Sequence, residues 1–289
     1  MHEGIGVPVS STRRRVNGVT LHCIEAGPED GPLVILLHGF PEFWWGWRRQ
    51  IGPLAQAGFR VLVPDQRGYN LSDKPEGRGA YDIDVLARDV VGLIDAVGRN
   101  ACTLVGHDWG GLVAWWTATR HPDRIASLAA VNAPHPDAAG PYMRSHPRQI
   151  LRSLYIGFFQ APYLPEAMLS ANRYRGLRRA LLQSSRPGTF SEADLSRYEE
   201  AWEKPGALTS MLNWYRALPL KPRRSTREPL PMPVLVLWGV RDEFLERGLA
   251  EASLSLCRQG RVHWIEATHW VHLEEHEIVN EALVDFLKS

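Results

Sequence analysis

One short stretch limits the folds open to this chain more than any other. The apolar residues 102–105 end at Gly106, and Asp108 follows two positions later, before Gly110 and Gly111. The apolar run indicates a buried strand, and the glycines indicate a tight turn from that strand into a helix. Because glycine lets the backbone turn sharply, we expect this turn to push the Asp108 side chain into a cleft.

The turn has the pattern of a nucleophile elbow, in which a serine usually stands between two glycines. Here Asp108 holds the serine position. A serine hydroxyl needs a base to become nucleophilic, whereas a carboxylate, with an ordinary pKa of about 3.9, is already charged at neutral pH. Attack by a carboxylate on a saturated carbon gives an ordinary ester, so we expect an alkyl electrophile as substrate. Water must then cleave that ester, which requires a histidine base, an acidic partner and an oxyanion hole.

Buried strands and amphipathic helices alternate along most of the chain, which predicts a doubly wound, mostly parallel α/β sheet. After a hairpin at Asn17-Gly18, the predicted strands are 33–37, 60–64, 102–105, 125–132, 234–239 and 261–266. The predicted helices of this part are 45–57, 82–97, 110–121 and 277–288.

The alternation stops at residues 133–136, and helices without a buried strand continue from there to about residue 222. A proline-rich segment, 219–233, then leads back to the sheet. The sequence therefore predicts a core made of residues 1–134 and 229–289, with an inserted helical cap at 135–228.

Composition excludes several classes of function. The 289 residues suit one sizeable domain with an insertion, and a formal net charge of +1 gives no field that favours nucleic acid or an anionic membrane. The three cysteines lie far apart, without metal or redox spacing. The N-terminus lacks a signal-peptide core, and no apolar run approaches the roughly 20 residues of a membrane span. We therefore expect a soluble cytoplasmic protein, with a homodimer as the assembly to consider.

The glycine-flanked Asp108 and further motifs described below resemble the α/β-hydrolase family, in particular its aspartate-nucleophile branch of epoxide hydrolases and haloalkane dehalogenases. The resemblance extends from about residue 15 to residue 288. Its most specific parts are the elbow and the Asn-Trp-Tyr-Arg segment at 213–216. It implies an α/β-hydrolase fold in which Asp108 is the nucleophile.

An acid and a base are expected at the carboxyl ends of late strands, where the active sites of open α/β sheets gather. Asp242 follows strand 234–239, with the adjacent Glu243 as an alternative. The base should follow the last strand, where His269 and His272 are both candidates. A His-Trp pair is typical of epoxide hydrolases at this place, and this favours His269.

A rival pattern overlaps the region of the base. His272, Glu275 and His276 match H-x-x-E-H, a zinc-binding pattern of some peptidases. No third ligand follows downstream, so we expect no metal ion. The region also departs from the family: Thr268 stands where a glycine often precedes the histidine, and Glu275-His276 replaces a common Lys-Pro or Glu-Pro.

Residues 38–41, His-Gly-Phe-Pro, resemble the family's oxyanion-hole motif, which implies the backbone N–H groups of Phe40 and Trp109 as donors. Two tyrosines resemble the pair that polarises the oxygen in epoxide hydrolases: Tyr155 precedes a Phe-Gln pair, and Tyr215 lies in Asn-Trp-Tyr-Arg. An epoxide oxygen leaves as a basic alkoxide, and a tyrosine hydroxyl can give it a proton. A largely apolar substrate pocket is expected to include Trp44, Trp109, Phe158 and Phe159.

The leading hypothesis is an epoxide hydrolase that converts a small apolar epoxide and water to a vicinal diol without a cofactor. A dehalogenase of haloalkanes or haloacids would use the same Asp-His-Asp machinery, but Trp109 stands where haloacid enzymes commonly have an arginine. A non-catalytic ligand receptor on the same fold would be expected to lose part of the triad, and every member is present. A serine esterase is disfavoured because the elbow has no serine.

Overall fold

The computed structural model describes residues 4–218 and 228–289, and within them eight strands form one sheet in the order β1-β2-β4-β3-β5-β6-β7-β8. β1 and β2 pair antiparallel through a turn at Asn17 and Gly18, both of which have positive φ, and β2 pairs antiparallel with β4. The other neighbours are parallel, as predicted. The strands are β1 (Val9–Val16), β2 (Val19–Ala26), β3 (Leu33–Leu37), β4 (Arg60–Pro64), β5 (Cys102–His107), β6 (Ile125–Val131), β7 (Val234–Gly239) and β8 (Gly260–Ile265).

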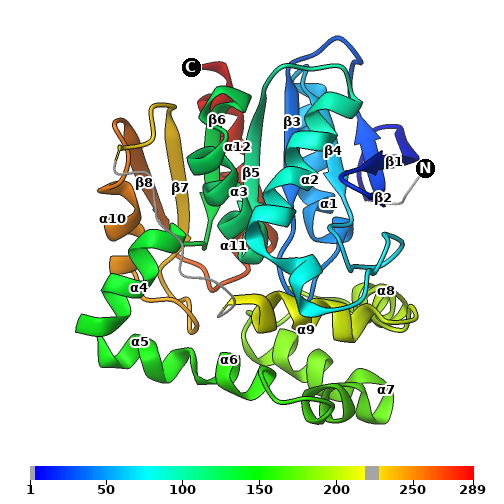
Figure 1. Cartoon of the computed structure of the whole chain (residues 1–289). Coiled ribbons are helices and arrows are strands. Elements are labelled where there is room, and N and C mark those ends of the chain that lie inside the picture. The colour runs from blue at the N-terminus through cyan, green and yellow to red at the C-terminus, as the bar shows by residue number, and fades with distance from the viewer. Residues whose placement is uncertain (1–3, 219–227) are drawn as a thin grey trace.

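Helices cover both faces of this sheet (Figure 1), so every residue of β3, β5 and β7 is buried. α2 and α3 pack against each other on one face, and α1 packs with α11 and α12 on the other. These helices are α1 (Arg48–Gln56), α2 (Ile83–Ala96), α3 (Trp109–Arg120), α10 (Gly248–Leu254), α11 (Val271–Glu274) and α12 (His276–Lys288). Short 3-10 turns are η1 (Trp44–Trp47), η2 (Arg78–Tyr81) and η3 (Pro122–Arg124).

The predicted α/β fold is confirmed, and most element boundaries agree within one or two residues. Asp82 caps α2, because its side chain accepts a hydrogen bond of 2.9 Å from the backbone N–H of Asp84. The predicted helix 45–57 is instead two elements, η1 and α1. No helix among the described residues is both long enough and apolar enough to cross a lipid bilayer.

A run of helices lies between β6 and β7 in the chain and extends across the end of the sheet in Figure 1. α7 is interrupted by non-helical backbone at Ala171 to Tyr174. The helices are α4 (Pro136–Ser145), α5 (Pro147–Arg152), α6 (Leu154–Phe159), α7 (Leu164–Gln183), α8 (Glu192–Trp202) and α9 (Ala207–Ala217). Residues 1–3 of the predicted core and 219–227 of the predicted cap and return segment lie outside the described residues.

Candidate active site

The elbow is a strained turn between β5 and α3. Asp108 has φ 51° and ψ −120°, a conformation that residues with a side chain rarely adopt. The turn is also tight, because a Cβ atom on Gly106 would collide with the backbone of Gly110, and one on Gly110 would collide with the backbone of Leu37. Only glycine fits at these two positions, which explains the spacing seen in the sequence.

The Asp108 carboxylate faces two groups that sequence analysis singled out. Its Oδ1 accepts a hydrogen bond of 2.8 Å from the backbone N–H of Phe40, which lies after β3. Its Oδ2 lies 3.7 Å from Nε2 of His269. The second predicted donor, the N–H of Trp109, is the first of α3 and has no acceptor within that helix. Phe40 and Pro41 are joined by a cis peptide bond.

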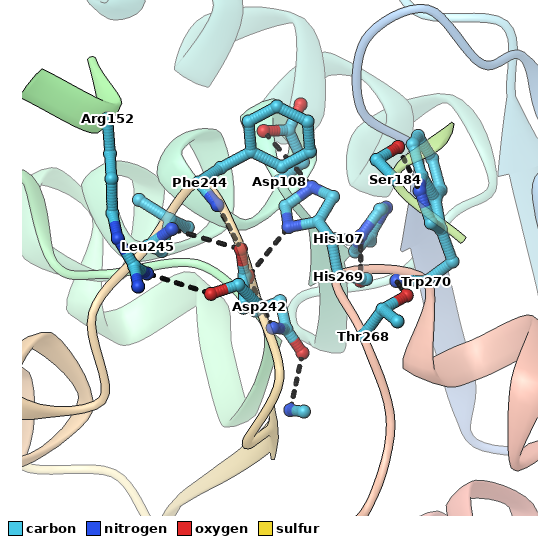
Figure 2. Close-up of polar contacts among 12 residues, drawn as sticks. His107, Asp108, Arg152, Ser184, Asp242, Phe244, Leu245, Thr268, His269 and Trp270 are labelled. Atoms are coloured by element: carbon cyan, nitrogen blue, oxygen red, sulfur yellow. Dashed lines mark hydrogen bonds and ion pairs between the residues drawn. The ribbon is translucent and has the colours of Figure 1, made fainter. Parts of the chain in front are cut away.

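Asp242 is buried and contacts the ring nitrogen of His269 that points away from Asp108 (Figure 2). Its Oδ2 lies 2.8 Å from Nδ1 of His269 and accepts a hydrogen bond of 2.6 Å from Asn132. Its Oδ1 accepts the backbone N–H groups of Phe244 and Leu245 at 2.7 and 2.9 Å. The alternative acid of the sequence analysis, Glu243, is exposed. In the structure, His269 therefore lies between the carboxylates of Asp108 and Asp242.

Burial and neighbouring charges shift the pKa values of His269 and Asp242. Burial lowers the pKa of His269, but the charge and hydrogen bond of Asp242, with the charge of Asp108, outweigh burial and raise that pKa to about 9. Burial raises the pKa of Asp242, but His269 and the hydrogen bond from Asn132 outweigh it and lower that pKa below its usual value. In the protein without substrate, His269 is therefore protonated at neutral pH between two carboxylates.

His272, the other candidate base, does not face Asp108. It is fully buried, and its ring lies 4.2 Å from that of His107 and 4.9 Å from that of Trp47. Burial, followed by the charge of His107, lowers the pKa of His272 to about 4. Its Nε2 is 3.5 Å from a carboxylate oxygen of Glu42.

Glu42, His107 and His272 form the group among the described residues that could hold a metal ion, since their ligand atoms lie within 4.8 Å of one another. Glu42 accepts from Tyr198 at 3.1 Å and lies 2.9 Å from Nδ1 of His107, whereas the two buried ring nitrogens of His272 have no hydrogen-bond partner in the described part of the chain. Glu275 of the rival H-x-x-E-H pattern pairs with Arg186, and neither Glu275 nor His276 belongs to this group.

The two tyrosines of the resemblance, Tyr155 on α6 and Tyr215 on α9, line the same cavities as Asp108, with their ring centroids 6.0 Å apart. Burial, followed by the charge of Asp108, raises the pKa of Tyr155. Burial, followed by the neighbouring Tyr155 and Asp108, raises the pKa of Tyr215. Both hydroxyl groups therefore keep their protons at neutral pH and can donate them.

Two cavities meet at Asp108, one of about 390 Å³ and one of about 200 Å³. Both are lined by Asp108, Tyr155 and Tyr215. Their other walls are mainly apolar. The larger cavity includes Trp109, Leu112, Trp116 and Leu249, and the smaller one Phe40, Phe159, Leu181 and Phe244.

Of the four expected pocket residues, Trp109 and Phe159 line these cavities, whereas Trp44 and Phe158 line neither. Trp44 is buried in the core, where its ring packs edge-on against that of Trp45. The sequence gives the residue type and position of Trp44 and Trp109 but does not give the direction of their side chains.

Sequence reasoning missed Asn132, whose side chain joins Asp242 to the backbone N–H of Gly239 at 2.8 Å. Its position directly after β6 was the available signal, because polar residues at the carboxyl ends of parallel strands converge. It also missed two residues of α5: Gln149 contacts the backbone of Phe244, and Arg152 contacts the backbone of Asp242, as Figure 2 shows for Arg152.

The chain is similar to known proteins over nearly its whole length. A model of the alpha/beta hydrolase fold matches residues 32–276. The AB hydrolase superfamily protein YfhM of Bacillus subtilis (strain 168) is 48% identical over 278 residues, which cover 94% of this chain and 96% of that protein. Epoxide hydrolase 4 of Homo sapiens is 37% identical over 288 residues, which cover 96% of this chain and 78% of that protein.

A solved structure gives the same result in three dimensions. The crystal structure of Bacillus megaterium epoxide hydrolase in complex with an inhibitor superimposes with a TM-score of 0.89 at 34% sequence identity, over 96% of this chain and 100% of that one. A match of this extent in sequence and fold defines membership. The chain is therefore a hydrolase of the α/β-hydrolase fold and belongs to the epoxide hydrolase family.

Proposed function

We propose that the protein hydrolyses small apolar epoxides to vicinal diols through a covalent ester on Asp108. One observation carries the proposal: at the junction of the two cavities, a carboxylate held by the Phe40 N–H faces a histidine on one side and two protonated tyrosines on the other. An epoxide ring at this junction has its carbon next to a nucleophile and its oxygen next to proton donors. Its substituents extend into one or both cavities.

In the first half of the reaction, Oδ2 of Asp108 forms a bond to an epoxide carbon and the bond from that carbon to the ring oxygen breaks. The ring oxygen takes the electron pair, and Tyr155 or Tyr215 supplies its proton. Oδ1 stays on the Phe40 N–H and becomes the carbonyl oxygen of the ester. The donor is thus already in place where negative charge develops later.

In the second half, His269 takes a proton from water, and the resulting hydroxide attacks Cγ of Asp108. The oxyanion on Oδ1 is stabilised by the N–H groups of Phe40 and Trp109, and its collapse breaks the ester bond. The leaving alkoxide takes the proton that His269 removed from water, which releases the diol, and the remaining proton on the new carboxyl group of Asp108 restores the tyrosine. Formation of the ester removes the charge of Asp108, which is one cause of the high pKa of His269. The pKa of His269 therefore falls in the ester, where a neutral base is needed.

The His269→Gln variant tests this route directly. With styrene oxide it should form the ester and fail to hydrolyse it, so intact mass spectrometry should show protein plus one substrate, and peptide mapping should place the adduct on Asp108. A single turnover of the wild type in heavy-oxygen water should leave the first diol unlabelled and put the label in the Asp108 carboxylate. A labelled first diol, or no adduct in the variant despite diol formation by the wild type, would exclude the ester.

Two further expectations belong to this proposal. We assign the helices between β6 and β7, at 135–228, the role of a cap that brings the tyrosines to the nucleophile. A dehalogenase remains the rival outcome of the test: halide release from haloalkanes without diol formation from epoxides would support it. The pair of tyrosine hydroxyls favours epoxides, since a halide leaves as a stable anion and needs no proton.

A further inference from the structure

The loop that follows β7, residues 242–246, carries the triad acid and is held from two sides. On the sheet side, Asn132 and the turn at Phe244 and Leu245 bind the carboxylate of Asp242. On the other side, Asp242, Phe244 and Glu246 contact α5, the second of the inserted helices. Gln149 and Arg152 bind the backbone of the loop, and the exposed Arg148 lies 3.9 Å from the carboxylate of Glu246.

Gln149 of α5 contacts this loop as a peptide group would. Its Nε2 donates to the carbonyl oxygen of Phe244 at 2.8 Å, and its Oε1 accepts the N–H of Glu246 at 2.8 Å. Nε2 also donates to the hydroxyl of Ser153 at 3.0 Å. The side chain is 1% exposed, so both loop bonds are shielded from water. A buried amide paired in both directions fixes the loop more firmly than one bond could.

Arg152, one turn further along α5, donates from Nη1 to the carbonyl oxygen of Asp242 itself at 2.8 Å, as Figure 2 shows. Its side chain lines neither cavity. The bond therefore has no direct contact with the space for substrate, and its effect must pass through Asp242. A charged donor on a carbonyl is a strong hydrogen bond and fixes the direction of the peptide that carries the acid.

We propose that Gln149 and Arg152 are positioning residues that hold the Asp242 loop against α5, so that Asp242 keeps His269 aligned for hydrolysis of the ester. This inference rests on the proposed function for the step that it assigns. The two halves of the reaction need different groups: attack by Asp108 needs the tyrosines, whereas hydrolysis needs His269 oriented by Asp242. Loosening the loop should therefore slow the second half much more than the first.

The kinetic test uses Arg152→Met, which keeps the length of the side chain and removes its donor. Single-turnover experiments with styrene oxide should show ester hydrolysis slowed between about 10-fold and 100-fold, the range expected for a misplacement of the order of 1 Å, with ester formation nearly unchanged. The ester should accumulate in mass spectra. Arg152→Lys, which retains a donor, should recover most of the rate. Arg144→Met is the matched control, because it makes the same change of side chain at an exposed arginine of the preceding helix, α4.

A second readout needs no substrate. Gln149→Leu removes both loop bonds without changing charge, so it should lower the pKa of His269 by about one unit as Asp242 moves away. NMR titration of the histidine ring measures this value in the folded variant. The titration also distinguishes failure of this inference from failure of the proposed function. If the wild type forms neither ester nor diol, the proposed function fails, but the titration still tests whether Gln149 holds Asp242 beside His269.

Three results would overturn the inference. One is an Arg152→Met enzyme that hydrolyses the ester at the wild-type rate. Another is equal slowing of both halves of the reaction, which indicates a general structural role. The third is an unchanged pKa of His269 in Gln149→Leu. If Arg152→Met does not fold, the Gln149→Leu titration and the Arg152→Lys kinetics decide the question.

Discussion

Replacing Asp242 with asparagine should lower the pKa of His269 from about 9 to below its ordinary value of 6.5. In the wild type, burial lowers this pKa, and the charge and hydrogen bond of Asp242 are the first two causes that outweigh burial. Asparagine has nearly the same shape but no charge, so burial then dominates. The rise from 6.5 to about 9 corresponds to about 3 kcal/mol of preferential stabilisation of the protonated ring.

This shift has a defined effect on stability. Because the folded-state pKa of His269 is raised, its contribution is fully present below the unfolded pKa of about 6.5 and is lost as pH rises from there to about 9. The wild type should therefore lose about 3 kcal/mol of unfolding free energy from this group across that window. The Asp242→Asn protein should lack this loss, so the stability gap between the two proteins should narrow as pH rises.

Urea unfolding of both proteins at several pH values across this window measures the gap, and NMR titration of the His269 ring measures the pKa directly. His269→Gln serves as the control, since it removes the titrating group and should flatten the same part of the profile. A pKa that stays near 9 in Asp242→Asn would refute the reasoning. So would a stability gap that is constant with pH.

Three further changes test the other parts of the site. Tyr215→Phe removes a proton donor and should slow ester formation by roughly 100-fold while leaving ester hydrolysis largely intact, as measured by single-turnover kinetics. Gly39→Ala places a methyl group 2.5 Å from Oδ1 and 2.9 Å from Cγ of Asp108, so diol formation should fall by at least about 100-fold even where thermal unfolding shows a folded protein. Asn132→Ala removes two buried hydrogen bonds and should cost about 3 kcal/mol in urea unfolding, with a cost below about 0.5 kcal/mol as the contrary result.

The core was predictable because its signals are local. Apolar runs such as 33–37 and 234–239 are buried strands as expected, since a strand covered on both faces has no polar side to obscure the pattern. The inserted helices gave weaker signals. The interruption of α7 at Ala171 to Tyr174 has no glycine or proline in it, so nothing in the sequence marked it.

Some residues of the candidate site were predictable from the sequence, and others were not. Asp108, Asp242 and His269 follow strands whose ends must converge, so order along the chain was enough to bring them together. Arg152 escaped detection because its partner is a backbone carbonyl, and any residue could provide that. The prediction of Trp44 as a pocket residue fails because the sequence gives the residue type without the direction of its side chain.

The conformation of Asp108 argues for its role independently of the family. An aspartate in front of a helix is most often an N-cap, whose side chain accepts a backbone N–H of the first turn and contributes about 1 kcal/mol. Asp108 stands at that position before α3, yet its side chain makes no capping bond. Its φ of 51° and ψ of −120° turn the carboxylate away from the helix, toward the Phe40 N–H and His269. A backbone of this kind costs roughly 1 to 3 kcal/mol. A residue that served only the fold would adopt the capping conformation, which relieves the backbone strain and gains the capping hydrogen bond. The strained conformation is therefore best explained by a carboxylate that is needed in the cleft.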